Sequence, residues 1–151
     1  MYADQHSALV ETPPDRAWQV VSRLGGVEDF YAPRALWQVR CGLDRLVGGP
    51  GYRIEGPGRP LEPGDRMDFW EVEAVRAPAR LRVRARTRLP GTAHLDVLVR
   101  PHSAGSELTL RTEFEPAGVA GHAYWWSSLA AHSAAFALMT RRLADLVTSA
   151  A

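Results

Sequence analysis

The sequence contains no lysine, a single cysteine and no long uninterrupted apolar run. Because all 18 basic residues are arginines, we attribute the bias to a GC-rich coding sequence and not to a phosphate-binding surface. Cys41 has no second cysteine to pair with, so an internal disulfide is excluded. No stretch approaches the roughly 18 apolar residues of a membrane span. The start, MYADQHSALVETPPD, lacks the basic and apolar regions of a secretory leader, so we expect a cytoplasmic protein with no membrane partner.

The charge of the chain is almost balanced, since 18 Lys+Arg against 17 Asp+Glu leave a net charge of +1. Nucleic-acid-binding domains usually carry a clearly basic surface, so no nucleic-acid partner is expected. With 151 residues, of which 46% are hydrophobic, the chain is long enough to form a globular core. We predict a single domain over residues 1–151.

Motifs of several enzyme classes are also missing. The glycine-rich segment LVGGPGYR (46–53) follows a predicted helix and lacks the Lys-Ser/Thr ending of a phosphate loop. The five histidines show no chelating spacing and Cys41 has no companion, so no metal site is expected. There is no G-x-S-x-G elbow to present a hydrolase nucleophile. We therefore predict no metal and no cofactor.

The hydrophobic period changes along the chain and predicts the order of the elements. Apolar residues three or four apart indicate helices, and alternation indicates strands. In chain order, the predicted elements are a strand at 5–11, a helix in PPDRAWQVVSRLGG (13–26), a helix at about 33–46, several strands between 52 and 116, and an Ala-rich helix at 122–148. A curved antiparallel sheet has one face to cover, and the last helix can cover it. The sequence therefore predicts an α+β helix-grip fold, in which the sheet wraps the C-terminal helix and leaves an internal cavity.

The segment ARLRVRARTRL (79–89) separates into an arginine face and an apolar face. Five arginines side by side cannot be buried without partners, so the apolar face is predicted to point inward. Glu71 and Glu73 lie in a second predicted strand and can pair with the arginines on the outer face.

That second strand, GDRMDFWEVEAV (64–75), is harder to orient. If Glu71 and Glu73 face outward, Trp70 turns inward, and Asp68 turns inward with it. Met67 and Phe69 then fall on the outer face. Either cover by residues 25–50 or a β-bulge that shifts the register would explain this exception.

The last predicted helix carries an apolar stripe with a histidine in its middle. The stripe consists of Trp125, Leu129, His132, Phe136, Met139 and Leu143. Few polar residues are predicted to face inward: Asp68, Thr87, Thr112, His132 and, after the glycine turn, Arg53.

His132, Asp68 and Arg53 are the predicted catalytic residues. A carboxylate near an imidazole in an apolar cavity fixes the tautomer of the ring and raises its pKa, which suits acid–base catalysis. Arg53 would polarise a carbonyl group. The alternative is structural: His132 and Asp68 are buried polar residues with local partners, such as Arg53 or Arg40 for the carboxylate.

Aromatic residues form the second candidate group. Trp37, Trp70, Trp125 and Trp126 occur in segments predicted to meet at the cavity, where aromatic walls suit a flat apolar ligand. The alternative for each of them is core packing. The predicted ligand-binding residues are Trp37, Trp70, Thr87, Thr112, Tyr124, Trp125, Phe136 and Met139.

An ordered run of segments resembles a known bacterial family. The segments are WQVRCGLDRLVGGPGYR, GDRMDFWEVE, LPGTAHLDV and FEPAGVAGHAYWW, followed by His132, Phe136 and Met139. They resemble an uncharacterised family in the START/SRPBCC-like (polyketide cyclase-like) superfamily, whose members often follow a short-chain-dehydrogenase-like domain. The resemblance covers about residues 25–145 and implies a helix-grip fold with an internal cavity. Positions that match recurring motif residues are Trp37, Arg40, Asp44, Arg53, Asp65, Asp68, Trp70, Tyr124 and His132.

This chain departs from the family pattern after the glycine turn. It reads GYRIEGPGRP where the family tends to have an arginine-rich segment, so the resemblance implies a less charged ligand. The expected function is a cofactor-independent cyclase, isomerase or lyase acting on an apolar, polyketide-like intermediate. One alternative is a non-catalytic carrier or sensor of a hydrophobic small molecule. A further alternative is an adaptor that docks on a dehydrogenase-like partner. The partner expected besides the small molecule is either a second copy of the chain, in a homodimer, or such a dehydrogenase-like protein.

Overall fold

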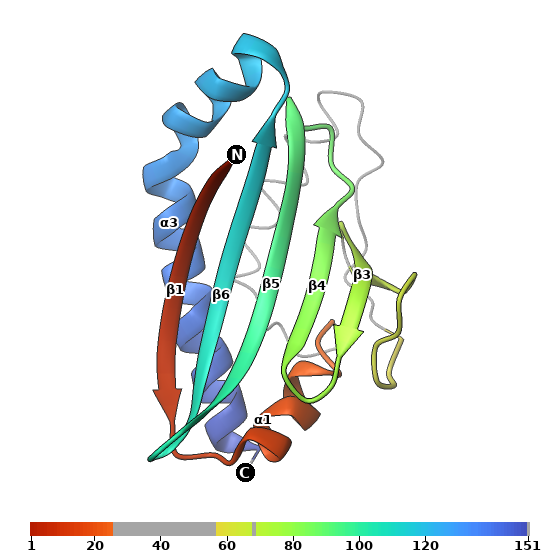
Figure 1. The fold of residues 1–151 in the computed structure, drawn as a ribbon, viewed down its shortest axis with the longest axis vertical. Helices are drawn as coiled ribbons and strands as arrows, with labels where there is room; N and C mark the ends of the chain where they lie inside the picture. The colour runs from red at the N-terminus through yellow and green to blue at the C-terminus, as the bar shows by residue number, and fades with distance from the viewer. Residues whose placement is uncertain (26–56, 68, 151) are drawn as a thin grey trace.

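The computed structural model describes residues 1–25, 57–67 and 69–150, which form an antiparallel sheet and two helices (Figure 1). In chain order the elements are β1 (Tyr2–Val10), α1 (Pro14–Val21), β2 (Arg66–Met67), β3 (Trp70–Arg76), β4 (Arg80–Ala85), β5 (Gly91–His102), β6 (Gly105–Pro116) and α3 (Gly118–Ser149). The predicted helix at 33–46 lies outside the described residues.

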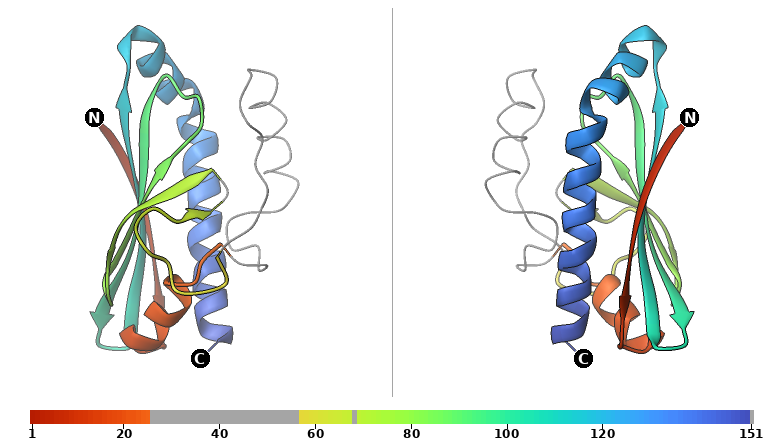
Figure 2. Two further views of the ribbon diagram at one scale, coloured as in Figure 1. Left: turned by 90° about the vertical axis from the view of Figure 1, so that its right-hand side faces the viewer. Right: turned by 90° about the vertical axis from the view of Figure 1, so that its left-hand side faces the viewer.

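The six strands pair in the order β1-β6-β5-β4-β3-β2, so the first strand of the chain lies beside the last. All five pairings are antiparallel. The sheet is curved, and α3 lies along one of its faces (Figure 2). This arrangement confirms the predicted α+β helix-grip fold.

The buried core lies between the sheet and the two helices. The predicted apolar stripe of α3 is buried at Trp125, Phe136, Met139 and Leu143. On the sheet, the inward-facing residues that are almost completely buried are Val72, Leu81, Val83, Leu95, Val97, Val99, Leu108 and Leu110. Helix α1 begins after Pro13 and adds Ala17, Trp18 and Val21 to one end of this core. Because burial of large aliphatic and aromatic groups is the main favourable term in folding, this packing stabilises the grip.

The predicted strand at 64–75 is in fact two strands. Met67, the last residue of β2, lies directly opposite Trp70, the first residue of β3. Cross-strand partners point to the same face of a sheet, so Met67 turns inward with Trp70. Phe69 packs against Trp70 with ring centroids 4.8 Å apart. The outer-face prediction is therefore wrong for Met67, and both side chains are buried, at 0% and 4% exposed.

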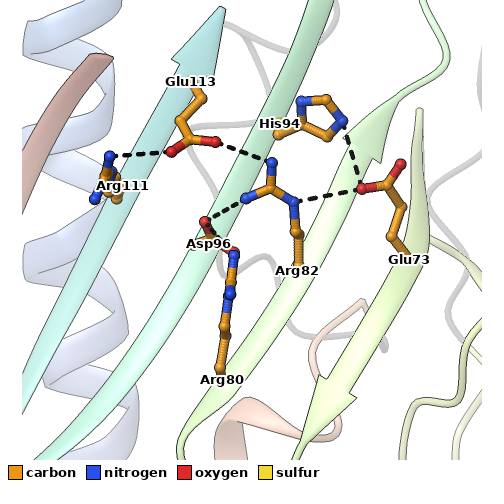
Figure 3. Close-up of polar contacts among 7 residues, drawn as sticks. All are labelled: Glu73, Arg80, Arg82, His94, Asp96, Arg111 and Glu113. Carbon is orange, nitrogen blue, oxygen red and sulfur yellow. Dashed lines mark hydrogen bonds and ion pairs between the residues drawn. The ribbon is translucent and has the colours of Figure 1, made fainter.

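The face of the sheet opposite α3 carries a network of ion pairs (Figure 3). At its centre, the Asp96 carboxylate accepts hydrogen bonds from Arg80 Nε at 2.8 Å and from Arg82 Nη1 at 2.7 Å. Arg82 also donates to Glu113 at 2.9 Å and lies 3.5 Å from Glu73. The prediction that this arginine face is outward and pairs with glutamates of β3 is confirmed, and Arg86 likewise pairs with Glu71.

Glu113 gives this network a testable pH dependence. The hydrogen bond from Arg82 holds the pKa of Glu113 below its ordinary value of 4.5. A carboxyl whose native pKa is depressed stabilises the fold above its unfolded pKa, and this stabilisation is lost as pH falls through the native pKa. We expect the free energy of unfolding to fall less steeply below about pH 5 in Glu113→Gln than in the wild type.

Urea unfolding at several pH values between about 7 and 3 checks this expectation. Glu115→Gln, an exposed neighbour on the same strand, is the control and should keep the wild-type slope. Parallel curves for Glu113→Gln and the wild type would contradict the assignment.

Candidate functional site

Five polar side chains from three elements gather between the sheet and α3. Exposure alternates along β1, so that Asp4 and His6 are half-buried. The register of β1 with β6 places Asp4 opposite Thr112. Helix α3 brings His132 and Ser133 against these strands. We call Asp4, His6, Thr112, His132 and Ser133 the inner polar cluster.

The hydrogen bonds of Thr112 fix the tautomer of His132. Thr112 Oγ1 donates its single proton to the carbonyl oxygen of Asp4 at 3.2 Å. It lies 3.1 Å from His132 Nε2, so this contact requires the ring to donate from Nε2. In the neutral ring, the atom able to accept a proton is then Nδ1. This arrangement is suited to a general base, and two residues predicted from the sequence, Thr112 and His132, make it.

Asp4, His6 and Ser133 resemble a hydrolytic triad but lack its geometry. His6 Nε2 lies 3.1 Å from the Asp4 carboxylate and also 3.1 Å from Ser133 Oγ. A triad needs two different ring nitrogens, one for the acid and one for the serine. Here a single Nε2–H points at two oxygen atoms, so His6 cannot take the proton of Ser133. The arrangement positions side chains and does not create a nucleophile.

Aromatic rings enclose His132 along α3. The ring centroid of Phe136 lies 4.4 Å from the imidazole and that of Trp125 lies 5.6 Å from it. Trp125 in turn stacks on Tyr2 of β1 at 5.1 Å and on Phe114 of β6 at 5.9 Å. The imidazole therefore lies in a mainly apolar environment with a flat aromatic surface beside it.

A second feature of the inner face lies farther along the sheet, on β3 and just beyond β4. Trp70 Nε1 and Thr87 Oγ1 are buried, and neither has a hydrogen-bond partner within the described part of the chain. Buried polar groups in native proteins are nearly always paired, so each such atom requires an explanation. Both residues were predicted to bind ligand.

The other predicted site residues do not lie together in one site. Asp68, Arg53 and Trp37 lie outside the described residues. Phe136 and Met139 belong to the buried core, and Tyr124 packs against Phe114 with centroids 5.6 Å apart. The expectation that Trp126 faces the cavity is wrong, because its side chain is 65% exposed and its ring meets only that of Tyr2, edge to face, among the described aromatic residues.

Sequence reasoning missed three members of the inner polar cluster: Asp4, His6 and Ser133. The predicted strand began at residue 5, whereas β1 begins at Tyr2. A signal was present, because Tyr2, Asp4, His6, Ala8 and Val10 alternate over the whole strand. Polar side chains at two of these positions concealed the alternation.

A family model for proteins of unknown function, DUF2867, matches residues 1–139. The chain belongs to the DUF2867 family. No curated protein matches this DUF2867 chain.

Solved structures show the same fold at low sequence identity. Protein CV1439 from Chromobacterium violaceum is 14% identical with a TM-score of 0.58, and the match covers 97% of this chain and 96% of that one. A protein from Rhodobacter sphaeroides is 12% identical with a TM-score of 0.62, over 97% and 92% of the two chains. DynU16, from the dynemicin biosynthetic locus, is 18% identical with a TM-score of 0.62, over 95% of this chain and 46% of its own.

Within residues 1–25, 57–67 and 69–150, no group of three or more His, Cys, Asp or Glu side chains is arranged to hold a metal ion. No helix in the same ranges has the length and apolar character needed to cross a membrane.

Arg59, one of the arginines after the glycine turn, forms an ion pair with a carboxylate of the same chain. Its guanidinium donates two hydrogen bonds of 2.9 Å to Asp65, which also accepts the backbone N–H of Glu62 at 2.8 Å. These contacts, first the one from Glu62 and then the one from Arg59, hold the pKa of Asp65 below its usual range. In this DUF2867 chain, Arg59 therefore braces the loop before β2.

Proposed function

We propose that this DUF2867 protein is a START/SRPBCC-like protein that binds an apolar, polyketide-like natural-product intermediate against the inner face of its sheet. It rearranges that molecule without a cofactor, as a cyclase, isomerase or lyase. The observation that carries this proposal is the setting of His132. Its imidazole is half-buried among aromatic rings, and Thr112 and Asp4 hold its Nε2–H in a fixed direction.

The chemistry proposed for His132 is proton transfer. The proton on a carbon between two carbonyl groups moves to the imidazole of His132, and the resulting enolate carbon bonds to a third carbonyl carbon of the same molecule. The imidazolium then returns the proton to the new alkoxide oxygen, so the ring is unchanged at the end. Orientation of the chain within the fold supplies much of the acceleration, and proton transfer supplies a further part.

The relatives support a small-molecule role. DynU16 belongs to a biosynthetic locus and shares the fold, although its chain is about twice the length that this protein covers. Fold likeness alone does not assign chemistry. The inner polar cluster and its aromatic surroundings are what favour an enzyme here. A second copy or a dehydrogenase-like partner remains a prediction.

The alternative is a non-catalytic carrier or sensor, and one observation favours it. Trp70 and Thr87 each have a buried polar group without a partner in the described ranges, and these groups are a neutral indole N–H and a neutral hydroxyl. Such groups bind a ligand but do not exchange protons readily near neutral pH. A carrier would bind the same molecule and release it unchanged.

Native mass spectrometry of protein purified from its own host tests the proposal. We expect an apolar small molecule to be retained under native conditions and lost on denaturation. Adjacent tryptophans of α3 provide matched variants, because Trp125 is 5% exposed and stacks on the sheet, whereas Trp126 is 65% exposed. The folded Trp125→Leu protein should carry little ligand, and Trp126→Leu should carry the wild-type amount.

Incubation of the recovered molecule with fresh protein then separates the two functions. Conversion to a product of equal mass, or of a mass lower by one water, supports the enzyme. Recovery of the unchanged molecule supports the carrier. Wild-type protein that carries no small molecule, and that no extract of the host stabilises against heat, would contradict both.

A further inference from the structure

Between β6 and β3 the inner face of the sheet carries small side chains with an aromatic residue at each end. Phe114 lies opposite Ala93, and Trp70 lies opposite Ala85. The register that pairs Arg84 with His94 brings Ala85 next to Ala93. Three inter-strand steps of about 4.8 Å separate Phe114 from Trp70 by about 14 Å.

Packing differs between the two ends of this inner face. Toward α1, residues such as Leu81 and Leu108 are completely buried. Between the two aromatic residues, Ala85 and Ala93 are only partly buried, and so is Thr87 beyond them. We call the methyl groups of Ala85 and Ala93, between the rings of Phe114 and Trp70, the floor. A flat molecule of two or three fused rings has the length and shape to lie on it.

The unpartnered polar atoms lie at the β3 end of this floor. Trp70 is 4% exposed, and its Nε1–H has no acceptor in the described part of the chain. Thr87 lies two residues beyond Ala85, the last residue of β4, and its hydroxyl oxygen is buried. Folding removed both groups from water without giving them a partner among the described residues, which is unfavourable unless a ligand supplies one.

We infer that Trp70 Nε1–H and the Thr87 hydroxyl form the polar end of a ligand subsite, where they bind a neutral oxygen atom of an elongated, flat, mostly apolar molecule that lies over Ala85 and Ala93. This inference rests on the proposed function and adds the class of ligand and its direction. The bound group is a carbonyl or a hydroxyl, because both protein groups are neutral and the neighbouring arginines of β4 point to the opposite face. The far end of the molecule then lies near Phe114 and Trp125, toward His132.

Two fluorescent probes that differ in one functional group test the subsite. Prodan is a naphthalene with a propionyl group at one end and a dimethylamino group at the other. Its analogue with a propyl group lacks the carbonyl oxygen. We expect the wild type to bind prodan about tenfold more tightly than the analogue, as one buried hydrogen bond allows.

Thr87→Val and Trp70→Phe each remove one polar group while keeping a side chain of similar shape. Each variant should lower the affinity ratio of the two probes, and the double variant should bring it close to one. Thr87→Val should also melt at the wild-type temperature or above it, because the buried hydroxyl it removes has no partner in the part of the chain that the structure describes. The control is Thr109→Val, since the Thr109 hydroxyl is bonded to Ser7 at 2.8 Å on the other face. That variant should lose stability and keep the tenfold preference.

The outcomes separate this subsite from the proposed function. Equal affinity of the wild type for both probes, or a preference that survives in Thr87→Val and Trp70→Phe, overturns the subsite and leaves apolar binding intact. A marked fall in the melting temperature of Thr87→Val overturns it too, because an ordered water would then hold the hydroxyl. Failure of the wild type to bind either probe counts against the proposed function itself.

Discussion

Asp96→Ala is expected to lose about 2–4 kcal/mol of unfolding free energy, the largest stability effect of any single change on the outer face. The Asp96 side chain is only 5% exposed and accepts three hydrogen bonds, two from Arg80 and one from Arg82. Without it, the 21%-exposed Arg82 loses the shortest of its contacts, and only Glu113 and the more distant Glu73 remain. A partly buried charge with fewer partners is costly, whereas Arg80 can turn to solvent.

Urea unfolding monitored by far-ultraviolet circular dichroism measures this loss. Glu115→Ala on β6 provides the control, because its side chain is exposed and the change should cost no more than about 0.5 kcal/mol. The double variant Asp96→Ala with Arg82→Met should recover part of the loss, since it removes the stranded cation as well. A loss below about 1 kcal/mol in Asp96→Ala would show that water replaces the carboxylate at little cost.

Much of the fold follows from local patterns. The apolar stripe of α3 and the alternation of β4 can be recognised within a few residues of sequence, because helix and strand periods repeat every turn or every second residue. The strand order and the central position of Asp96 cannot be found in this way. Asp96 becomes the centre of the ion network only because β5 pairs with β4 in a register that brings Arg82 opposite it.

Part of the site could also be predicted from local periodicity. His132 and Thr112 stand out as polar residues on apolar faces, and the structure brings them to 3.1 Å. The contribution of β1 depends on pairing between the two ends of the chain, since Asp4 lies opposite Thr112. The polar end at Trp70 and Thr87 shows the reverse case. Their residue types pointed to ligand binding. The observation that supports it, the absence of hydrogen-bond partners among the described residues, is visible only in three dimensions.

His132→Gln is expected to lower turnover of the host-derived ligand by about 10²–10⁴-fold, as loss of a general base does. Glutamine carries an amide N–H that can still donate to Thr112 Oγ1, but it has no atom that takes and returns a proton near neutral pH. The aromatic contacts with Trp125 and Phe136 need a side chain of similar length, which glutamine keeps better than alanine does. We therefore expect the melting temperature and the ligand affinity to change little while turnover falls.

Thr112→Val separates chemistry from positioning. It removes the acceptor that holds His132 Nε2–H, together with the bond to the Asp4 carbonyl, but leaves the base itself in place. Turnover should fall less than in His132→Gln, because the ring can still accept a proton in some of its orientations. The combination of both changes should be no slower than His132→Gln alone, since two residues that act on one proton transfer are not additive. Wild-type turnover in His132→Gln would remove the imidazole from the mechanism, so that any acceleration would have to come from the shape of the inner face alone.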